Sequence, residues 1–230
     1  MTHTGFSQLR NGGKRVQSTL GRWKSSVLEP LNPALPNRVG LGWFRRRSSW
    51  ALDPKLCPCD LHFVEYLDER HLTNKTIFHF GTGGHHYVGV ECHARGTNEV
   101  LGVTAAAREH QAYVKLVLAD AALAKSYKVL FADIYTLTET TLPDFDVVSL
   151  FHLCEFTPSS QPEDAGAVIH DDESLLGLFV SKLKPGGKIL FYEGSFGWRR
   201  AQAIVSDFVD RGLLRPVESF KTLLVYEAGA

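Results

Sequence analysis

From residue 76 onward the sequence alternates short runs of β-branched and aromatic residues with segments of helical periodicity. Five of these runs are predicted to be buried strands: Thr76–Phe80, Glu99–Thr104, Lys128–Ala132, Phe145–Phe151 and Lys188–Glu193. Strands that are joined through helical segments pair in parallel, because the crossover returns the chain to the same edge of the sheet. The alternation therefore predicts an α/β fold with a doubly wound, mostly parallel sheet.

Helices are predicted where apolar residues recur three and four positions apart. They are Asp60–Glu69, Ala105–Ala124, a segment beginning at Asp171–Glu173, and a segment containing Ala201–Val209. The second has a single apolar stripe, made of Tyr113, Val114, Val117, Leu118 and Ala121. The third begins with acids and ends with lysines before Pro185, which suits the helix dipole and the usual place of proline after a helix.

Two further strands, Val217–Phe220 and Thr222–Tyr226, are separated by a single residue. Such a short link excludes a helical crossover, so these strands pair antiparallel as a hairpin if they are neighbours. The sequence thus predicts a seven-stranded sheet that is mostly parallel and carries a C-terminal antiparallel hairpin strand.

Residues 1–55 differ in composition from residues 56–230, and they are interpreted as a basic N-terminal arm or lid attached to one Rossmann-like domain. Residues 1–50 contain nine Lys and Arg residues against one acid, Glu29. Frequent prolines and glycines limit any helix there to a short segment near Val16–Val27. The basic Arg45–Arg47 run, flanked by aromatic residues, is compatible with nucleic-acid contact. A lid over the acidic body of the protein is the favoured interpretation, and a mitochondrial transit peptide has a similar composition.

Composition argues against several other classes of protein. The formal net charge is zero, which is not expected of a protein that coats polyanions. No apolar run approaches the about 18–20 residues that a membrane-spanning helix needs. The four cysteines, Cys57, Cys59, Cys92 and Cys154, show no disulfide framework, so a reducing compartment and a cytoplasmic location are expected.

The first predicted strand runs directly into Gly81-Thr82-Gly83-Gly84-His85-His86. A glycine-rich turn at this place lets the backbone approach a ligand closely, and the following helix offers free N–H groups. A dinucleotide fingerprint would need glycine at position 86, where histidine stands, and the Gly-Lys-Ser/Thr pattern of a phosphate loop is absent. A ligand without phosphates therefore fits the turn better.

Four segments resemble the motifs of class I methyltransferases that use S-adenosylmethionine, and they occur in the family's order. They are His79–His85 for the glycine motif, Phe131-Ala132-Asp133-Ile134 for the third strand, Phe145–Leu153 for the fourth strand, and Leu183-Lys184-Pro185-Gly186-Gly187-Lys188-Ile189-Leu190 for the fifth. The resemblance covers about residues 60–230. It implies a Rossmann-like fold and transfer of the sulfonium methyl to an O, N or C acceptor of a small molecule.

The resemblance also implies roles for individual residues. Gly81, Thr82, Gly83, Gly84 and His85 would form the cofactor turn, while Thr104 with Glu109 would meet the ribose. Asp133 and Ile134 would flank the adenine, and Phe151 would line the edge of the cofactor. His152 and Glu155, which follow the fourth strand, are the candidate bases that would face the methyl acceptor.

This chain departs from the family pattern at two acidic positions. The acid that opens the glycine motif is His79 here, and the acid that ends the second strand is Thr104. Methyltransferases that resemble cyclopropane-fatty-acid synthases carry Gly-Val-Thr at the second place with a glutamine one turn later, and Glu109 has the matching offset, with Gln111 close behind. The missing acids support an alternative, a non-catalytic methyltransferase-like domain that binds a metabolite or a partner. A third hypothesis is a methyltransferase that acts on RNA.

The histidines near the turn have both structural and functional interpretations. His85 and His86 lie at a predicted helix N-terminus, where the dipole disfavours protonation, so a neutral imidazole there would contact the cofactor's carboxylate, act as a base or simply cap the turn. His79 lies in a buried strand and is interpreted as a core histidine. Two groups of residues are close in sequence and could be considered as metal ligands: His79, His85, His86 and His93, and Cys57, Cys59 and His62. Neither group matches a known ligand spacing, so no metal is expected.

Overall fold

The computed structural model describes residues 39–40, 49–157 and 169–229. The chain divides into two units, Met1–Arg38 and Val39–Ala230. All the elements below belong to the second unit. The helix predicted near Val16–Val27, the Arg45–Arg47 run and most of the loop after the fourth predicted strand lie outside the described residues.

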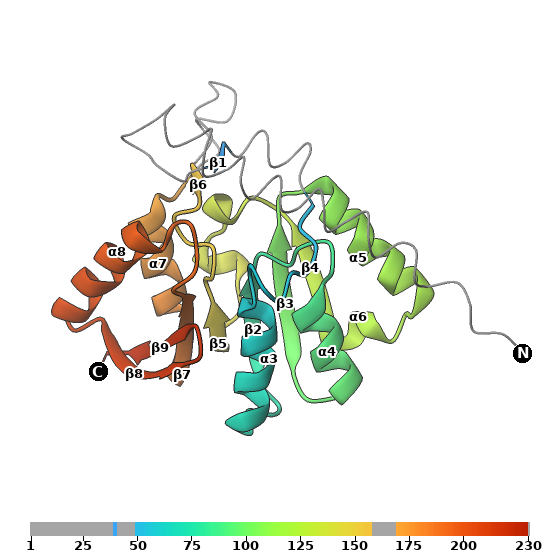
Figure 1. Ribbon diagram of the computed structural model, residues 1–230, viewed down its shortest axis with the longest axis horizontal. Helices are drawn as coiled ribbons and strands as arrows, with labels where there is room; N and C mark the ends of the chain where they lie inside the picture. Colours follow the sequence, from blue (N-terminus) through green and yellow to red (C-terminus); the bar gives the residue numbers. More distant parts are fainter. Residues whose placement is uncertain (1–38, 41–48, 158–168, 230) are drawn as a thin grey trace, which may run out of the picture. The chain divides into compact units, whose positions relative to one another are not determined.

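Seven strands form one sheet in the order β4-β3-β2-β5-β7-β9-β8 (Figure 1). Parallel pairing joins β2 (Thr76–Phe80), β3 (Glu99–Thr104), β4 (Tyr127–Phe131), β5 (Phe145–Ser149) and β7 (Leu183–Tyr192). The remaining two, β8 (Leu214–Phe220) and β9 (Leu223–Ala228), form an antiparallel hairpin whose second strand also pairs antiparallel with β7. The predicted fold class and the C-terminal hairpin are confirmed.

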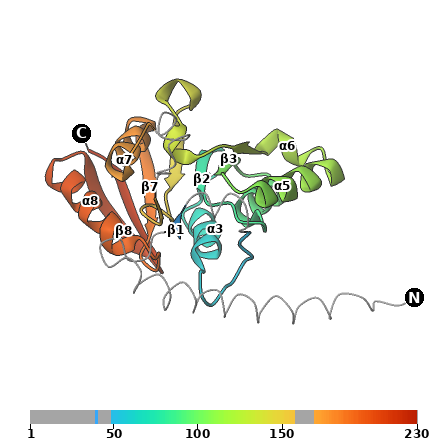
Figure 2. The ribbon, with the colours of Figure 1, turned by 90° about the horizontal axis from the view of Figure 1, so that it is seen from above.

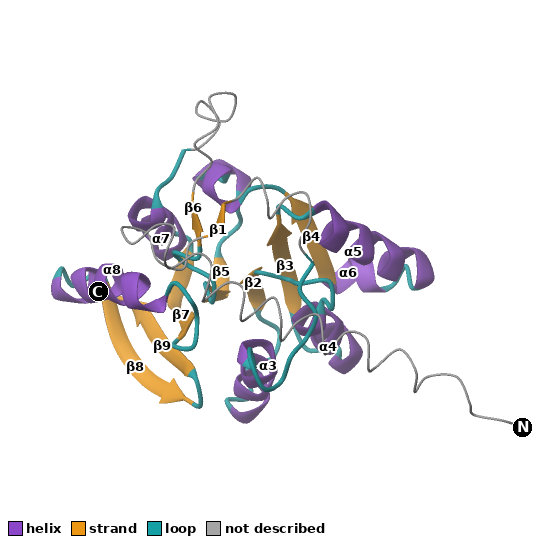
Figure 3. Ribbon diagram, turned by 45° about the horizontal axis from the view of Figure 1, so that its top comes forward, coloured by secondary structure: helices purple, strands orange, loops and turns teal. Residues whose placement is uncertain are grey.

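Helices pack on both faces of the sheet and bury two apolar clusters (Figures 2 and 3). One cluster lies beneath α3 (Cys59–Glu69), α4 (Tyr87–Arg95) and the short α6 (Leu123–Ser126). The other lies beneath α7 (Asp172–Ser181) and α8 (Trp198–Asp210). The central strands are buried on both faces, as expected for parallel strands covered by crossover helices.

The helix predicted over Ala105–Ala124 is wrong in its length, and its apolar stripe is not buried throughout. The structure has α5 (Ala107–Ala119) and the separate α6, because Asp120 leaves the helical conformation and its side chain accepts from the N–H of Ala122 at 2.9 Å. A short acidic side chain that bonds to the local backbone in this way competes with helix continuation. Val114 and Leu118, placed in the stripe, are 40% and 81% exposed.

The predicted signals at the start of α7 are confirmed, whereas its end differs. Asp171 is the N-cap, its carboxylate accepts from the N–H of Ser174 at 2.8 Å, and the two residues form a reciprocal capping box. The helix ends at Ser181, and β7 begins at Leu183, earlier than the predicted Lys188–Glu193. The Pro185-Gly186-Gly187 segment therefore lies within the start of the strand.

A small pairing that the sequence did not predict joins two distant segments near the end of β5. Strand β1 (Val39–Gly40) pairs in parallel with β6 (Phe156–Thr157), which follows the loop after β5. The short η1 (Ile134–Thr136) and η2 (Glu139–Thr141) follow β4. Across the described part of the chain, every helix is too short or too polar to cross a membrane.

Helix α4 lies so close to the sheet that Gly89, in its first turn, tolerates no side chain. A Cβ at Gly89 would lie 2.4 Å from atoms of the Tyr127 ring, which is fully buried. In α7, by contrast, a Cβ at Gly177 would have only Phe208 Cζ nearby, at 3.9 Å.

We expect Gly89→Ala to lower the free energy of unfolding by about 1–3 kcal/mol, the usual range for overpacking a core. Gly177→Ala is the matched helical control, and we expect it to leave stability unchanged or raise it by up to about 1 kcal/mol, since alanine restricts the unfolded chain. Urea unfolding followed by circular dichroism measures both. Equal effects of the two substitutions would contradict this account of α4 packing.

Candidate functional site

The glycine turn leaves β2 with backbone angles that favour glycine. Gly81 and Gly83 have φ values of +95° and +56°, in the region that L side chains rarely adopt. His86, at φ 49°, then caps α4 in a left-handed conformation. The turn lies where the chain passes from β2 to α4, beside the neighbouring strand β5, which is the topological switch point of the sheet.

The space that side chains would fill on this turn is taken by other parts of the chain. A Cβ at Gly81 would lie 2.3 Å from Cδ2 and 2.9 Å from Nε2 of His152. At Gly83 it would lie 2.5 Å from Nε2 of His85, and at Gly84 it would lie 2.5 Å from Oγ of Ser49. The predicted turn residues are thus brought together with His152, and the segment at residue 49 covers them.

Trp50 links the turn to the predicted ribose-binding residues through its backbone. Its carbonyl accepts from the N–H of Gly84 at 2.7 Å, and its own N–H donates to Oε1 of Glu109 at 3.1 Å. Thr104 donates to the other carboxylate oxygen of Glu109 at 2.7 Å. The structure therefore brings Thr104 and Glu109 together, although Glu109 is buried, and burial raises the pKa of its carboxyl group.

The residues predicted to flank the adenine, Asp133 and Ile134, and the residue predicted to line the cofactor's edge, Phe151, are all buried. The carboxylate of Asp133 accepts from the N–H of Tyr135 at 3.1 Å and so caps η1, while Ile134 is buried. Phe151 is 1% exposed and packs edge-on against Phe63 of α3, with ring centroids 5.5 Å apart. Phe151 therefore contributes to the core beneath α3.

His152 and Glu155 form an ion pair, with Nδ1 and Oε1 3.2 Å apart, in which the Glu155 side chain is 7% exposed and the His152 side chain 20% exposed. The same carboxylate oxygen accepts from Oγ of Ser195 at 2.8 Å and from the N–H of Phe196 at 3.2 Å. Burial lowers the pKa of His152, but the charge of Glu155 outweighs this effect, and the pKa rises to about 9. The pair places a positively charged imidazole against the glycine turn at neutral pH.

Asp60 is the site residue that sequence reasoning missed. It lies in the first turn of α3 and is 3% exposed. Its two carboxylate oxygens lie 3.6 Å from Nε2 of His79 and 3.6 Å from Nε2 of His85. Burial raises the pKa of Asp60 to about 7, although the charge of His152 acts in the opposite direction. An acid supplied by α3 thus stands beside the position where the family motif has its acid.

His79 lies between a hydroxyl of strand β5 and the carboxylate supplied by α3. Nδ1 lies 2.8 Å from Oγ of Ser149 on β5, and that hydroxyl donates to the carbonyl of Phe78 at 3.4 Å. Nε2, on the other side of the ring, faces the carboxylate of Asp60. Burial lowers the pKa of His79 to about 3, so the ring is neutral.

The other two histidines of the turn have different environments. Nδ1 of His85 accepts from the N–H of Tyr87 at 3.2 Å, which leaves the proton of the neutral ring on Nε2, facing Asp60. Burial lowers the pKa of His85 to about 4. His86 bonds to the hydroxyl of Tyr127 and to the carbonyl of Glu109, and only 1% of it is exposed, so it fixes β4 and α5 to the turn.

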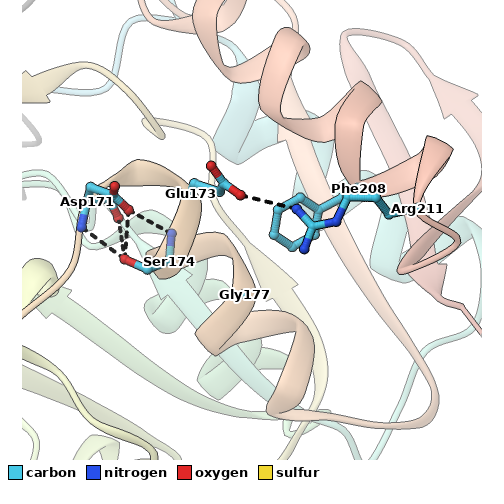
Figure 4. Close-up of a pocket in the computed structure, with 6 residues that line it drawn as sticks. All are labelled: Asp171, Glu173, Ser174, Gly177, Phe208 and Arg211. Carbon is cyan, nitrogen blue, oxygen red and sulfur yellow. Dashed lines mark hydrogen bonds and ion pairs between the residues drawn. The ribbon is translucent and has the colours of Figure 1, made fainter.

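Two other features of the described residues bear on ligand binding. No group of three or more His, Cys, Asp and Glu side chains among them is placed to hold a metal ion. A hollow of about 300 Å³ lies between α7 and α8 and is lined by Asp171, Glu173, Ser174, Gly177, Phe208 and Arg211 (Figure 4). Its charged groups already pair within the chain, as Arg211 does with Glu173 at 3.1 Å.

Comparisons with known proteins identify the fold. No family model matches the sequence, and no curated protein matches it either. Among solved structures, the methyltransferase CcbJ from Streptomyces caelestis is similar with a TM-score of 0.55 and 12% identity, covering 84% of this chain and 97% of that one. The glycopeptide N-methyltransferase MtfA has a TM-score of 0.50 and 11% identity, covering 82% of this chain and 92% of that one.

The chain therefore shares the fold of these two methyltransferases. A third similar structure, the ribosomal protein L11 methylase from Lactobacillus delbrueckii subsp. bulgaricus, has a TM-score of 0.49 and 12% identity over 78% of this chain and 81% of that one. Identities of this size establish the methyltransferase fold alone.

We expect His152 to titrate near pH 9, as the ion pair with Glu155 requires. In Glu155→Gln the negative charge is gone while the burial remains, so the pKa should fall by at least one unit, on the order of the shifts that paired charges cause. NMR titration of the imidazole C–H signals measures the pKa, and His152→Gln identifies the signal. A pKa that is the same in the wild type and in Glu155→Gln would contradict the proposed pairing.

Proposed function

We propose that this protein is a methyltransferase that uses S-adenosylmethionine. The observation that carries the proposal is the arrangement of the glycine turn Gly81–Gly84, whose one side chain is the buried Thr82, beside the Thr104–Glu109 pair at the ends of adjacent parallel strands. In a doubly wound sheet, ligands bind outside the carboxyl ends of the strands at the switch point. The methyltransferase fold and the four sequence motifs support the same conclusion.

The residues present fit such a cofactor. Gly81, Gly83 and Gly84 leave no room for a side chain of their own, and the one side chain of the turn, that of Thr82, is buried beside Gly102. Glu109 already accepts a backbone N–H from Trp50, and its carboxylate has further lone pairs with which it would accept a ribose hydroxyl while that bond is kept. Asp133 and Ile134 would bound the adenine. When bound, the cofactor supplies a methyl group activated by a sulfonium.

His152 would manage the acceptor's proton, and Glu155 would position it. Methyl transfer is an in-line displacement, so the protein chiefly has to align the two reactants and remove a proton where the acceptor carries one. His152 lies against Gly81 with its Nε2 toward the turn, while Glu155 is held by Ser195 and Phe196. A second positive charge nearby would lower the pKa of His152 and so favour the basic form of its imidazole.

Residues 49–50 belong to segment 1–55, which the sequence predicted as an arm or lid, and they would serve as its lid over the turn. Ser49 covers Gly84, and Trp50 bonds to both sides of the site through its backbone. We propose that the lid opens to admit the cofactor and closes over it, with a small molecule as the acceptor. The same bonds also motivate an alternative, a non-catalytic domain in which Trp50 permanently occupies the groups that would bind the ribose.

The first test is titration calorimetry of the full chain with S-adenosylhomocysteine. We expect binding in the micromolar range or tighter, and we expect Gly83→Arg to abolish it, because any side chain there collides with His85 and the Trp50 carbonyl. Gly186→Arg is the matched control. Gly186 also has a positive φ, of +72°, but nothing lies within 4 Å of its Cβ position, so binding should persist.

The outcomes separate the two hypotheses. A folded wild-type chain that binds no S-adenosylhomocysteine would favour the non-catalytic alternative. Equal loss of binding in both glycine variants would show that backbone strain, rather than the glycine turn, is responsible.

The lid can be tested by hydrogen exchange at the amides of Trp50 and Gly84. If residues 49–50 close over the ligand, both amides should exchange at least about tenfold more slowly in saturating S-adenosylhomocysteine, as expected of a segment stabilised by a bound ligand. The amide of Asn74, which bonds to the carbonyl of Thr97, is the remote control. Faster exchange of both amides on binding would mean that the segment is displaced instead.

A further inference from the structure

Cys57 and Cys59 lie with their sulfur atoms 3.5 Å apart at the beginning of α3. A tight turn holds Cys57 in place, because its N–H donates to the carbonyl of Asp53 at 2.9 Å. The carboxylate of Asp53 in turn accepts from the N–H groups of Lys55 and Leu56. The proximity of the two sulfur atoms is therefore built into the local backbone.

The two thiols differ in access and in acidity. Cys57 is partly exposed, whereas Cys59 is 2% exposed. The thiol of Cys59, supported by the charge of His152, lowers the pKa of Cys57 to about 7, and the pKa of Cys59 is raised well above the ordinary value. An accessible thiolate beside a buried thiol is the usual arrangement of an attacking and a resolving cysteine.

The other two cysteines lack these features. Cys92 is 2% exposed, and burial raises the pKa of its thiol to about 11. Cys154 is also 2% exposed and lies in the loop between His152 and Glu155. Among the described cysteines, the reactive geometry is confined to the Cys57-Pro58-Cys59 segment.

We propose that Cys57 and Cys59 form an oxidisable dithiol beside the candidate active site, with low-molecular-weight disulfides such as oxidised glutathione as the oxidant. The thiolate of Cys57 attacks one sulfur of oxidised glutathione, forms a mixed disulfide and releases one glutathione thiolate. Cys59, after losing its proton, then attacks the Cys57 sulfur and releases the second glutathione thiolate. In total the two protein thiols lose two electrons and two protons, and one glutathione disulfide becomes two glutathione thiols.

Oxidation would change the charge next to His152. The groups that raise the pKa of His152 are Glu155, Cys57 and Asp60, while burial lowers it. Histidines 79 and 85 also face this cluster and are neutral. Disulfide formation removes the Cys57 thiolate, so the pKa of His152 should fall. Formation of the disulfide is independent of the proposed methyl transfer, and only a catalytic consequence of this pKa change would rest on that function.

The experiment treats the folded full chain with oxidised glutathione and follows it by intact mass and by peptide mapping after alkylation. We expect the wild type to lose two hydrogens and to show a single Cys57–Cys59 link. Cys59→Ser should retain one glutathione on Cys57, and Cys57→Ser should stay unmodified at Cys59. Cys92→Ser, which alters an equally buried cysteine, should still form the link.

Two results would overturn the proposal without relying on any variant. One is a folded wild type that keeps all its thiols, and the other is a wild type that stops at the mixed disulfide on Cys57. As a second readout, the NMR titration of His152 should move to lower pH in the oxidised protein. An unchanged titration of His152 would show that the disulfide does not affect the candidate active site. Binding of S-adenosylhomocysteine is measured separately and reports on the proposed function alone.

Discussion

Because Gly81 has no side chain, the imidazole of His152 lies directly against the backbone of the glycine turn. This contact joins the ends of β2 and β5. The imidazole keeps its charge in a buried place through Glu155, which is in turn fixed by Ser195 and Phe196 in the loop after β7. Three strand ends are thereby tied to one charged group. A side chain at position 81 would displace His152 and leave the carboxylate of Glu155 buried without its partner, which is strongly destabilising.

The charge of His152 also sets the protonation of its neighbours. It lowers the pKa of Cys57, and it opposes the effect of burial on Asp60. His79 and His85, which face Asp60, stay neutral because burial and the surrounding imidazoles disfavour further positive charge. A cluster of this kind contributes little to stability, since desolvation of the charged groups offsets their attraction. Strongly shifted pKa values of several groups around a switch point are more typical of functional sites.

Much of the fold follows from the sequence, because β-branched runs, turn residues and capping residues act locally. Two of the predicted strands, Thr76–Phe80 and Glu99–Thr104, have the same bounds as β2 and β3. The failures have non-local or side-chain causes. Asp120 ends a helix whose apolar pattern continues, because its side chain bonds to the local backbone. The sequence did not indicate Asp60 as a site residue, because His79 and His85 follow it by 19 and 25 residues. Only the packing of α3 brings the three side chains together. Trp50 could not be found from residue type, since its contacts with the site are made by backbone atoms.

The backbone hydrogen bonds of Trp50 bear on how a lid over this site would open. Glu109 is buried, so its carboxylate must always have donors, and Thr104 supplies one in either state. The N–H of Trp50 is the other donor while the lid is closed, and a ribose hydroxyl, which is equivalent in kind, would stand in for it only while the lid is open. Exchanging one hydrogen bond for another changes the free energy little, whereas leaving the carboxylate unpaired costs about 1–3 kcal/mol or more. A backbone donor for which the ligand can substitute during opening therefore holds Glu109 in place without the ligand, which is what a preorganised binding site requires.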